Sequence, residues 1–364
     1  MFGSVDAYLT PAVQMAIDDI NASGGLMGRQ VELVVRDDQG DPSIVAQKAS
    51  ELKAAGCVAI VGCLLDSCDQ VLSQWAKDNQ IPVSITCAAT LSLRTTAFNK
   101  YTFNTNPVSL AMARIFVQNI SQQEDVKRIY FIGSDENVSH DIYDLFWREI
   151  VKTRPDMTNL GASWVGVMDM EFSNIISAAL AKKPDLILGG IAGPPWTSLV
   201  QQGQQFNLFD KTKWAGYNLI GAELTSPFGD AYPVGIQSTT WSPFFLDEKP
   251  MHDFSEAYHA KNNVYPADIT ICYYISALTV LESIKKANSL DPDAIVAAME
   301  TTTFEVPTGT VHYRTFDHQL NLPVWYARSG YSDDYSLAIG LDMIKYQDEV
   351  YPTEEEILAL RAAK

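Results

Sequence analysis

The sequence predicts an α/β protein built from two doubly wound, parallel-sheet lobes. At 364 residues the chain exceeds the usual size of a single apolar core, so two domains are expected. Residues 57–90 hold an apolar run ending in Gly62, a polar turn, a helix-compatible segment and a second apolar run, which together make a βαβ unit. The same alternation restarts at residue 128, after a boundary near residues 121–125.

The first run of elements surrounds this βαβ unit. Residues 11–22 have a helical apolar period and stop at Ser23-Gly24-Gly25, a typical helix end. A strand is expected at 31–35, a turn at 37–42, a helix from Ser43 to residue 55, an extended run at 101–104 and a helix at 109–120. Ligands of such sheets bind beyond the carboxyl ends of the strands. That rule places residues 62–70 and 86–90 at the mouth of a cleft.

The second run predicts strands at 128–133, 164–167, 185–189, 213–216 and 235–241, with helices at 141–154, 171–182 and 196–205. Three helices follow at 253–261, 269–286 and 292–300, then extended runs at 309–313 and 322–328. The tail, residues 331–364, is predicted to be a surface appendage.

Composition narrows the class of function. A hydrophobic content of 47% and a charged content of 19% fit a soluble globular protein. The net charge of -18 argues against nucleic acid or anionic lipid as a partner. The chain has no phosphate-binding loop, nucleophile elbow or dinucleotide fingerprint, so no enzymatic activity and no cofactor are expected. It opens without a basic start or an apolar signal segment, so it is either cytosolic or recorded without its export segment.

The five cysteines do not follow a metal-binding spacing, and the histidines fall elsewhere, so no metal is expected. Cys57 and Cys272 are interpreted as small buried residues. A disulfide among Cys63, Cys68 and Cys87, all near the cleft mouth, stays open.

Residues 16–28, 31–38 and 41–42 resemble the type I periplasmic binding proteins, and within them the leucine/isoleucine/valine-binding branch. The similarity continues through residues 59–62, 81–82, 88–90, 184–185 and 309–311 and covers nearly the whole chain except the tail. It implies an extracytoplasmic solute receptor, periplasmic or an extracellular lipoprotein, that closes two lobes on a small polar ligand such as an amino acid, related carboxylate or amide. The receptor is expected to be a monomer that delivers the ligand to an ABC transporter permease.

The resemblance also implies three crossovers between the lobes, near residues 119–125, 241–250 and 323–326. Lobe 1 would comprise residues 1–121 and 249–323, and lobe 2 residues 122–248 and 324–364. Family members begin with a strand inside the first sheet, which this sequence lacks, because only Met1 and Phe2 precede the first loop. An interior strand cannot be missing without exposing its neighbours' backbone groups. Residues upstream of this numbering are therefore expected.

In the family, hydroxyl and backbone groups of two loops in lobe 1 bind the carboxylate of the ligand; we call these groups the carboxylate grip. The resemblance assigns this role to the backbone of Ala88 and Ala89 and to the hydroxyl of Thr90. The family's serine in the paired loop falls at Asp66 or at Ser67, depending on one gap. Ser67 can donate a hydrogen bond to an anion, whereas an ionised Asp66 would favour a cationic or hydroxylated group. The structural alternative is that Asp66, Ser67 and Thr90 cap helices.

Lobe 2 departs from the family. Family members bind the ligand in lobe 2 with an aromatic residue and with a carboxylate that pairs with its ammonium group. The aligned positions here are Ile191 and Asn218, so neither contact is kept, although Glu223 or Asp141 could substitute for the carboxylate. Trp196, Tyr217 and Trp241 are candidate ligand contacts, with burial in a core or hinge as the alternative. A ligand-sensing receptor or regulator of the same fold, without a transport role, is the alternative function.

Overall fold

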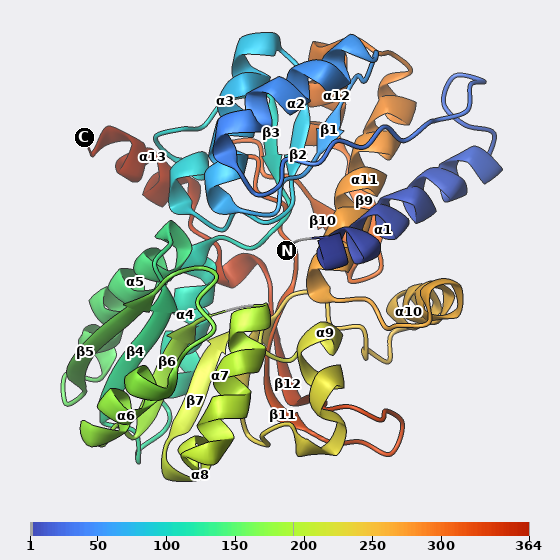
Figure 1. The fold of residues 1–364 in the computed structure, drawn as a ribbon. Coiled ribbons are helices and arrows are strands. Elements are labelled where there is room, and N and C mark those ends of the chain that lie inside the picture. Colours follow the sequence, from blue (N-terminus) through green and yellow to red (C-terminus); the bar gives the residue numbers. More distant parts are fainter. Residues whose placement is uncertain (1–2, 192, 364) are drawn as a thin grey trace. The chain divides into compact units, whose positions relative to one another are not determined.

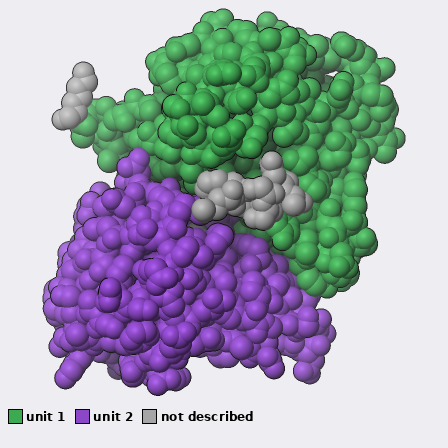
Figure 2. Space-filling model, in the orientation of Figure 1, with its two compact units in different colours: residues 1–108, 246–322, 352–364 green, residues 109–245, 323–351 purple. Residues whose placement is uncertain are grey.

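The chain folds as two units, each with its own sheet (Figure 1 and Figure 2). The computed structural model describes residues 3–191 and 193–363. Unit 1 comprises residues 1–108, 246–322 and 352–364, and unit 2 comprises residues 109–245 and 323–351. Both combine parallel strands with helices, which confirms the predicted α/β class. Within the described residues, no helix has the length and apolar character that a membrane crossing needs.

Unit 1 contains a small parallel sheet in the order β1 (Ile60–Val61), β2 (Val83–Ile85) and β3 (Thr102–Asn104). Two further strands, β9 (Thr303–Val306) and β10 (Gly309–His312), form an antiparallel pair. The helices of this unit are α1 (Gly3–Ala22), α2 (Pro42–Ala54), α3 (Asp66–Asn79), α10 (Lys249–Asn262), α11 (Asp268–Ala287), α12 (Pro292–Thr301) and α13 (Glu354–Ala362), with a 3-10 turn, η1 (Leu91–Arg94).

Local sequence signals explain where these helices begin and end. The side chain of Asp41 accepts a hydrogen bond from the Ser43 N–H at the start of α2, as an N-cap does. Helix α1 ends at Ala22, and in the turn that follows Gly25 has a φ of +74° and its N–H donates to the Ile20 carbonyl. A Cβ at Gly25 would lie 2.1 Å from the Arg29 carbonyl oxygen, so this turn requires glycine.

Unit 2 is organised around a seven-stranded sheet in the order β12, β11, β8, β7, β6, β4, β5. Its strands are β4 (Arg128–Ser134), β5 (Thr158–Val165), β6 (Leu186–Gly190), β7 (Lys213–Tyr217), β8 (Gln237–Thr240), β11 (Val324–Gly330) and β12 (Ile339–Tyr346). All pairs are parallel except those of β11 with β8 and β12. The helical segments are α4 (Ser109–Ile120), α5 (Asn137–Thr153), α6 (Ser173–Ala181), α7 (Pro194–Gln205), α8 (Leu208–Lys211), α9 (Ala222–Thr225), η2 (Ser226–Ala231) and η3 (Asp348–Val350).

Two sequence-based expectations about unit 1 are wrong. Residues 31–35 form no strand; instead the Val31 N–H and carbonyl bond the side-chain amide of Asn21 at 2.8 and 2.9 Å. A strand exists only by pairing, and none of the described strands pairs with this run. Helix α1 begins at Gly3 rather than at residue 11, because Pro11 lies inside the helix and not at its first turn.

The ends of the two units also differ from the expected lobes. Helix α4, expected in lobe 1, belongs to unit 2, where Arg114 donates to the carbonyls of Val350 and Tyr351 at 3.2 and 3.1 Å. The tail is not an appendage. Strand β12 extends the large sheet, and α13 belongs to unit 1, where Arg361 donates to the carbonyls of Arg94 and Phe316 at 2.9 and 2.6 Å.

Candidate functional site

The loop after β1 leads directly into α3, where the neighbouring residues Asp66 and Ser67 differ in burial. Asp66, the first residue of α3, is 8% exposed, whereas Ser67 is exposed. Ser67 lines a shallow depression on the helical surface together with Ala46 of α2 and Trp75 of α3. Of the two alternatives for this loop, Asp66 is therefore the one held inside the unit. Neither caps the helix, since the N-cap position is Leu65 and it makes no side-chain bond.

Asp69, one turn further along α3, joins the two loops of interest. Its Oδ1 accepts the Cys63 N–H at 2.6 Å, and the Ala88 N–H also donates to this carboxyl group. The side chain is fully buried. Burial raises the pKa of Asp69 well above its usual value and Asp66 adds to the rise, while the two N–H groups and Arg94 oppose it. Asp69 thus accepts hydrogen bonds from backbone N–H groups in both loops, the one after β1 and the one after β2.

Arg94 holds the loop that follows β2 by hydrogen bonds to its backbone carbonyls. Its side chain is 0% exposed, and its guanidinium donates to the carbonyls of Ala88 and Thr90 at 2.8 and 3.0 Å. It also donates to the Asn106 carbonyl and to Gln319 Oε1, both at 2.9 Å. A buried guanidinium needs such partners, and here most of them are backbone oxygens. The conformation of the loop is therefore set by a side chain inside the unit.

The expected carboxylate grip is only partly available in this loop. Both backbone groups of Ala88 are engaged, the N–H with Asp69 and the carbonyl with Arg94. Ala89 is buried beside it. Thr90 is buried too, and its Oγ1 lies 3.3 Å from Ser92 Oγ without making a capping bond to η1. The backbone of Ala89 and the hydroxyl of Thr90 therefore stay candidate contacts for a solute.

The cysteines near these loops are all free thiols, as are Cys57 and Cys272. Burial raises the thiol pKa of Cys63 and of Cys87, and it raises that of Cys68 to about 12, with further contributions from nearby carboxyl groups. Thiols in this state are poor nucleophiles and poor metal ligands. No group of His, Cys, Asp and Glu side chains among the described residues is arranged to hold a metal ion.

In unit 2, two of the expected contacts lie inside the hydrophobic core. Ile191 is 1% exposed and Trp196 is 0% exposed, and both belong to the cluster that includes Trp214 and Tyr232. The Trp196 Nε1–H donates to the Tyr232 hydroxyl at 2.9 Å, which in turn donates to the Leu219 carbonyl. For Trp196 the structure therefore matches the alternative of a core residue.

The loop after β7 carries the other candidates of unit 2. Tyr217 is buried, and its hydroxyl donates to the Gly190 carbonyl at 3.3 Å. Asn218 follows in the left-handed region, with a φ of +51°, and its N–H donates to the Thr239 carbonyl at 2.7 Å. Asn218 as a residue is half-buried, but its Oδ1 atom is buried and has no hydrogen-bond partner within the described part of the chain. This oxygen is an acceptor that the unit itself does not use.

The remaining candidates lie at other positions in unit 2. Trp241 is 4% exposed and follows β8 directly. Asp141, one alternative to Asn218, is tied to α4 by a hydrogen bond of 3.0 Å from Ser109 Oγ. Glu223, the other alternative, lies in α9 with a carboxylate close to Gly221. Neither carboxylate takes the place of Asn218 in the loop after β7.

Sequence reasoning missed Asp69 and Arg94. Asp69 is three residues after Asp66, so both carboxylates lie on one face of the first turn of α3. A second acidic residue facing inward at a helix start was a usable signal. Arg94 stands alone among small and apolar residues after the Thr90 loop, and only the three-dimensional structure shows what it bonds.

The chain is similar to proteins of known class. The family model described as "Periplasmic binding protein" matches residues 2–334. A "Leucine-, isoleucine-, valine-, threonine-, and alanine-binding protein" from Pseudomonas aeruginosa is 28% identical over 303 residues, covering 82% of this chain and 79% of the relative. A "Leu/Ile/Val-binding protein homolog 1" from Brucella abortus is 23% identical over 314 residues, covering 84% and 81%.

Solved structures share the fold. An amino acid ABC transporter substrate-binding protein from Pseudomonas fluorescens superposes with a TM-score of 0.83 at 18% identity, covering 97% of this chain and 94% of that one. A solute-binding protein of an ABC transporter from Rhodopseudomonas palustris, in complex with 3,4-dihydroxy benzoic acid, has a TM-score of 0.83 at 16% identity and covers 93% of each chain.

Proposed function

Because the chain belongs to the periplasmic binding protein family, we propose that it is the solute-binding receptor of an ABC importer and acts in the periplasm. One relative is described as a leucine-, isoleucine-, valine-, threonine- and alanine-binding protein, and proteins of similar fold are described as binding proteins of ABC transporters. Both facts support a receptor that binds a small polar solute and leaves it chemically unchanged. The permease of the importer is the expected partner, and the receptor is expected to act as a monomer.

The chemistry of the solute follows from one observation, the position of the Asp69 carboxyl group. It takes up the Cys63 N–H and engages the Ala88 N–H, two donors that would otherwise be offered to an anion. In unit 1 the buried Asp66 carboxylate and the Thr90 hydroxyl stay candidate contacts, and unit 2, taken by itself, has an acceptor in Asn218 Oδ1. Carboxylate and amide oxygens accept hydrogen bonds. The preferred solute therefore carries ammonium, amide or hydroxyl donors, as amino acids, amides and hydroxylated acids do.

Native mass spectrometry of the purified protein tests binding directly, because a tightly bound solute is carried through purification. A thermal-shift panel of amino acids, amides, ureas, benzoate and hydroxybenzoates then identifies the class, since a solute that binds only the folded state raises the melting temperature. We expect solutes with N–H or O–H donors to produce the shift. A shift produced by benzoate alone would contradict the proposed chemistry, and no shift across the panel would contradict the receptor function.

Asp66 and Ser67 form a matched pair for testing the loop. Asp66→Asn keeps the size of the side chain but removes its charge, and loss of a charge-assisted hydrogen bond should weaken solute binding by about 10- to 100-fold. Ser67→Ala, on the exposed face of the same helical turn, should leave the affinity unchanged. Equal effects of the two substitutions in isothermal titration calorimetry would remove Asp66 from the site.

Thr90→Val tests the retained part of the loop after β2. The substitution replaces a hydroxyl group by a methyl group of similar size, so the melting temperature of the solute-free protein should change little. The thermal shift on adding the solute should be largely lost. A full shift in Thr90→Val would show that its hydroxyl does not contact the solute.

A further inference from the structure

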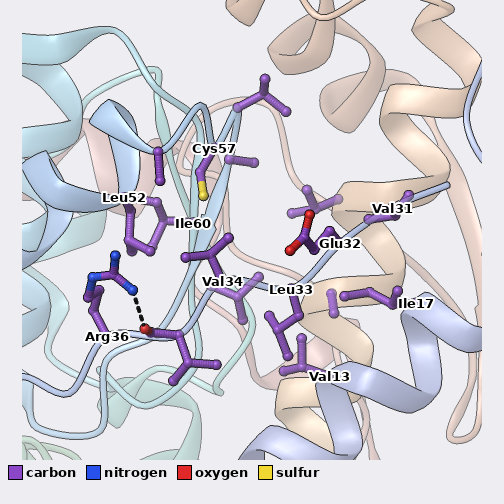
Figure 3. A pocket seen from close by; sticks show the side chains of 18 of the residues that line it. Val13, Ile17, Val31, Glu32, Leu33, Val34, Arg36, Leu52, Cys57 and Ile60 are labelled. Atoms are coloured by element: carbon purple, nitrogen blue, oxygen red, sulfur yellow. Dashed lines mark hydrogen bonds between the residues drawn. The ribbon is translucent and has the colours of Figure 1, made fainter. Parts of the chain in front are cut away.

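Unit 1 keeps its apolar cavity apart from the buried polar groups around Arg94. A cavity of about 580 Å³ next to β1 is lined largely by aliphatic side chains, among them Val13, Leu33 and Ile60 (Figure 3). The Arg94 guanidinium, which holds the loop after β2, lies outside that cavity and belongs to a set of buried polar groups. Buried polar groups that are bonded to one another make their surroundings rigid.

Arg94 joins the loop after β2 to two other segments of unit 1. Besides two carbonyls of that loop, its guanidinium bonds the Asn106 carbonyl and Gln319 Oε1, both at 2.9 Å. The chain passes from unit 1 to unit 2 after residue 108 and again after residue 322. Asn106 lies two residues before the first of these boundaries, and Gln319 lies three residues before the second. One buried side chain therefore bonds a candidate solute loop and both segments by which the chain leaves unit 1.

These two segments are held side by side. The Asn104 N–H donates to the His318 carbonyl at 2.8 Å, and the Leu320 N–H donates to the Asn104 carbonyl at 2.8 Å. Gln319 is fully buried, and its Nε2 donates to the Asn106 carbonyl at 3.0 Å. The side-chain amide of Gln319 thus bonds Arg94 through its oxygen and the neighbouring segment through its nitrogen.

A second arginine bonds the place where the chain returns to unit 1. The Arg314 guanidinium donates to the carbonyl of Pro352 at 2.7 Å, and Pro352 is the first residue of unit 1 after the boundary at 351/352. Arg314 also forms an ion pair with Asp317, which is 0% exposed. Asp317 Oδ1 accepts the Gln319 N–H at 3.2 Å. A continuous chain of bonds therefore runs from Pro352 through Arg314, Asp317 and Gln319 to Arg94.

We propose that a buried polar relay couples the loop after β2, as a candidate solute loop, to three of the places where the chain passes between the units. The relay consists of Arg94, Gln319, Asp317 and Arg314. A shift of the loop carbonyls on solute binding moves the Arg94 guanidinium, and its rigid planar fork passes the shift to the Asn106 carbonyl and Gln319. Arg94 and Arg314 are thus positioning residues, which act through the loop and not on the solute.

Residue-resolved amide hydrogen exchange measures this coupling without any solute. Arg314→Met removes the ion pair and the carbonyl bond at the end of the relay that is farthest from the loop. Exchange is followed at Ala89 and Thr90 in the loop. Val83, whose N–H is bonded within the sheet of unit 1 at 2.8 Å, is the internal reference.

Two further variants control for a general loss of stability. Tyr258→Phe is the matched control, because the buried Tyr258 hydroxyl also donates to a backbone carbonyl, that of Tyr8 at 2.9 Å, and does not belong to the relay. Arg314→Lys is the conservative variant, since it keeps the positive charge opposite Asp317 but loses the fork. It also takes the place of Arg314→Met if that protein does not fold.

Arg314→Met should speed exchange at Ala89 and Thr90 relative to Val83 at least about tenfold, and Arg314→Lys should do so about threefold. Tyr258→Phe should leave this ratio unchanged. An unchanged ratio in the Arg314 variants would overturn the proposal. An equal change in Tyr258→Phe would overturn it too, because exchange in the loop would then report only a general loss of stability.

The relay rests on the proposed function, in which the loop after β2 contacts the solute. Because the exchange experiment uses no solute, a negative result would refute the relay and leave the receptor function untouched. The absence of a thermal shift across the solute panel would instead refute the receptor function and leave the measured coupling in place.

Discussion

Replacement of Asp69 by asparagine should remove a pH dependence from the stability of unit 1. Burial raises the pKa of the carboxyl group in the folded state, so folding favours its protonated form. Such a group contributes stability that is fully present below its unfolded pKa, near the reference value of 3.8, and that is lost as the pH rises through the folded pKa. The wild-type protein should therefore lose stability relative to Asp69→Asn as the pH increases above about 4.

The size of the effect follows from the hydrogen bonds. Asparagine keeps an acceptor oxygen for the Cys63 N–H, so Asp69→Asn should cost at most about 1 kcal/mol at low pH. Asp69→Ala leaves the buried N–H groups of Cys63 and Ala88 without this acceptor, at roughly 1–3 kcal/mol each, and should cost about 2–6 kcal/mol at any pH. The alanine variant thus separates loss of hydrogen bonds from loss of the titrating group.

Urea unfolding at a series of pH values from 4 to 8 measures the free energy of unfolding of each variant. Asp78→Asn, at an exposed position near the end of α3, is the control for a general change of charge. The reasoning is refuted if the wild-type protein gains stability over Asp69→Asn as the pH rises. That result would mean that the N–H groups and Arg94 outweigh burial and keep the carboxyl group ionised.

Three further substitutions test the packing around the loops. Arg94→Met removes donors to four buried oxygens and should lower the free energy of unfolding by about 3–5 kcal/mol in urea titrations; a loss below 1 kcal/mol would contradict the role of Arg94 in holding the loop. Tyr232→Phe leaves the Trp196 N–H unpaired and should cost about 1–3 kcal/mol without changing solute affinity, whereas weakened binding in calorimetry would return Trp196 to the site. Asn218→Gly should be tolerated at a φ of +51° while Asn218→Val should cost roughly 1–3 kcal/mol, and equal melting temperatures of the two variants would argue against backbone strain there.

The sequence predicted most of the fold because hydrophobic period and turn residues are local properties. It predicted the strands of unit 2 that pair with neighbours on both sides, such as β4 and β6. It failed at residues 31–35, an apolar run that pairs with none of the described strands. It also failed for β12 and α13, whose places depend on long-range contacts such as that of Arg361 with the Arg94 carbonyl.

The candidate site was predictable in part. The positions of the two loops follow from the ends of parallel strands, while Asp66 or Ser67 and Thr90, which come from the family resemblance, stay predictions. The burial of Ile191 and Trp196 could not be predicted, because a residue just after a strand can turn toward the core or toward the solvent. Asp69 and Arg94 were missed because polar side chains are expected at the surface, and only the three-dimensional fold provides the partners that make their burial tolerable.

The bond from Arg361 to the Arg94 carbonyl has a consequence for synthesis of the protein. The two residues are 267 positions apart, so residues 352–363, which are synthesised late, complete the unit that residues 3–108, which are synthesised early, begin. All of unit 2 is synthesised before residue 352, and it can fold while unit 1 still lacks its final helix. During that interval the early residues of unit 1 lack the hydrogen bonds that α13 supplies, such as those of Arg361 to the Arg94 and Phe316 carbonyls.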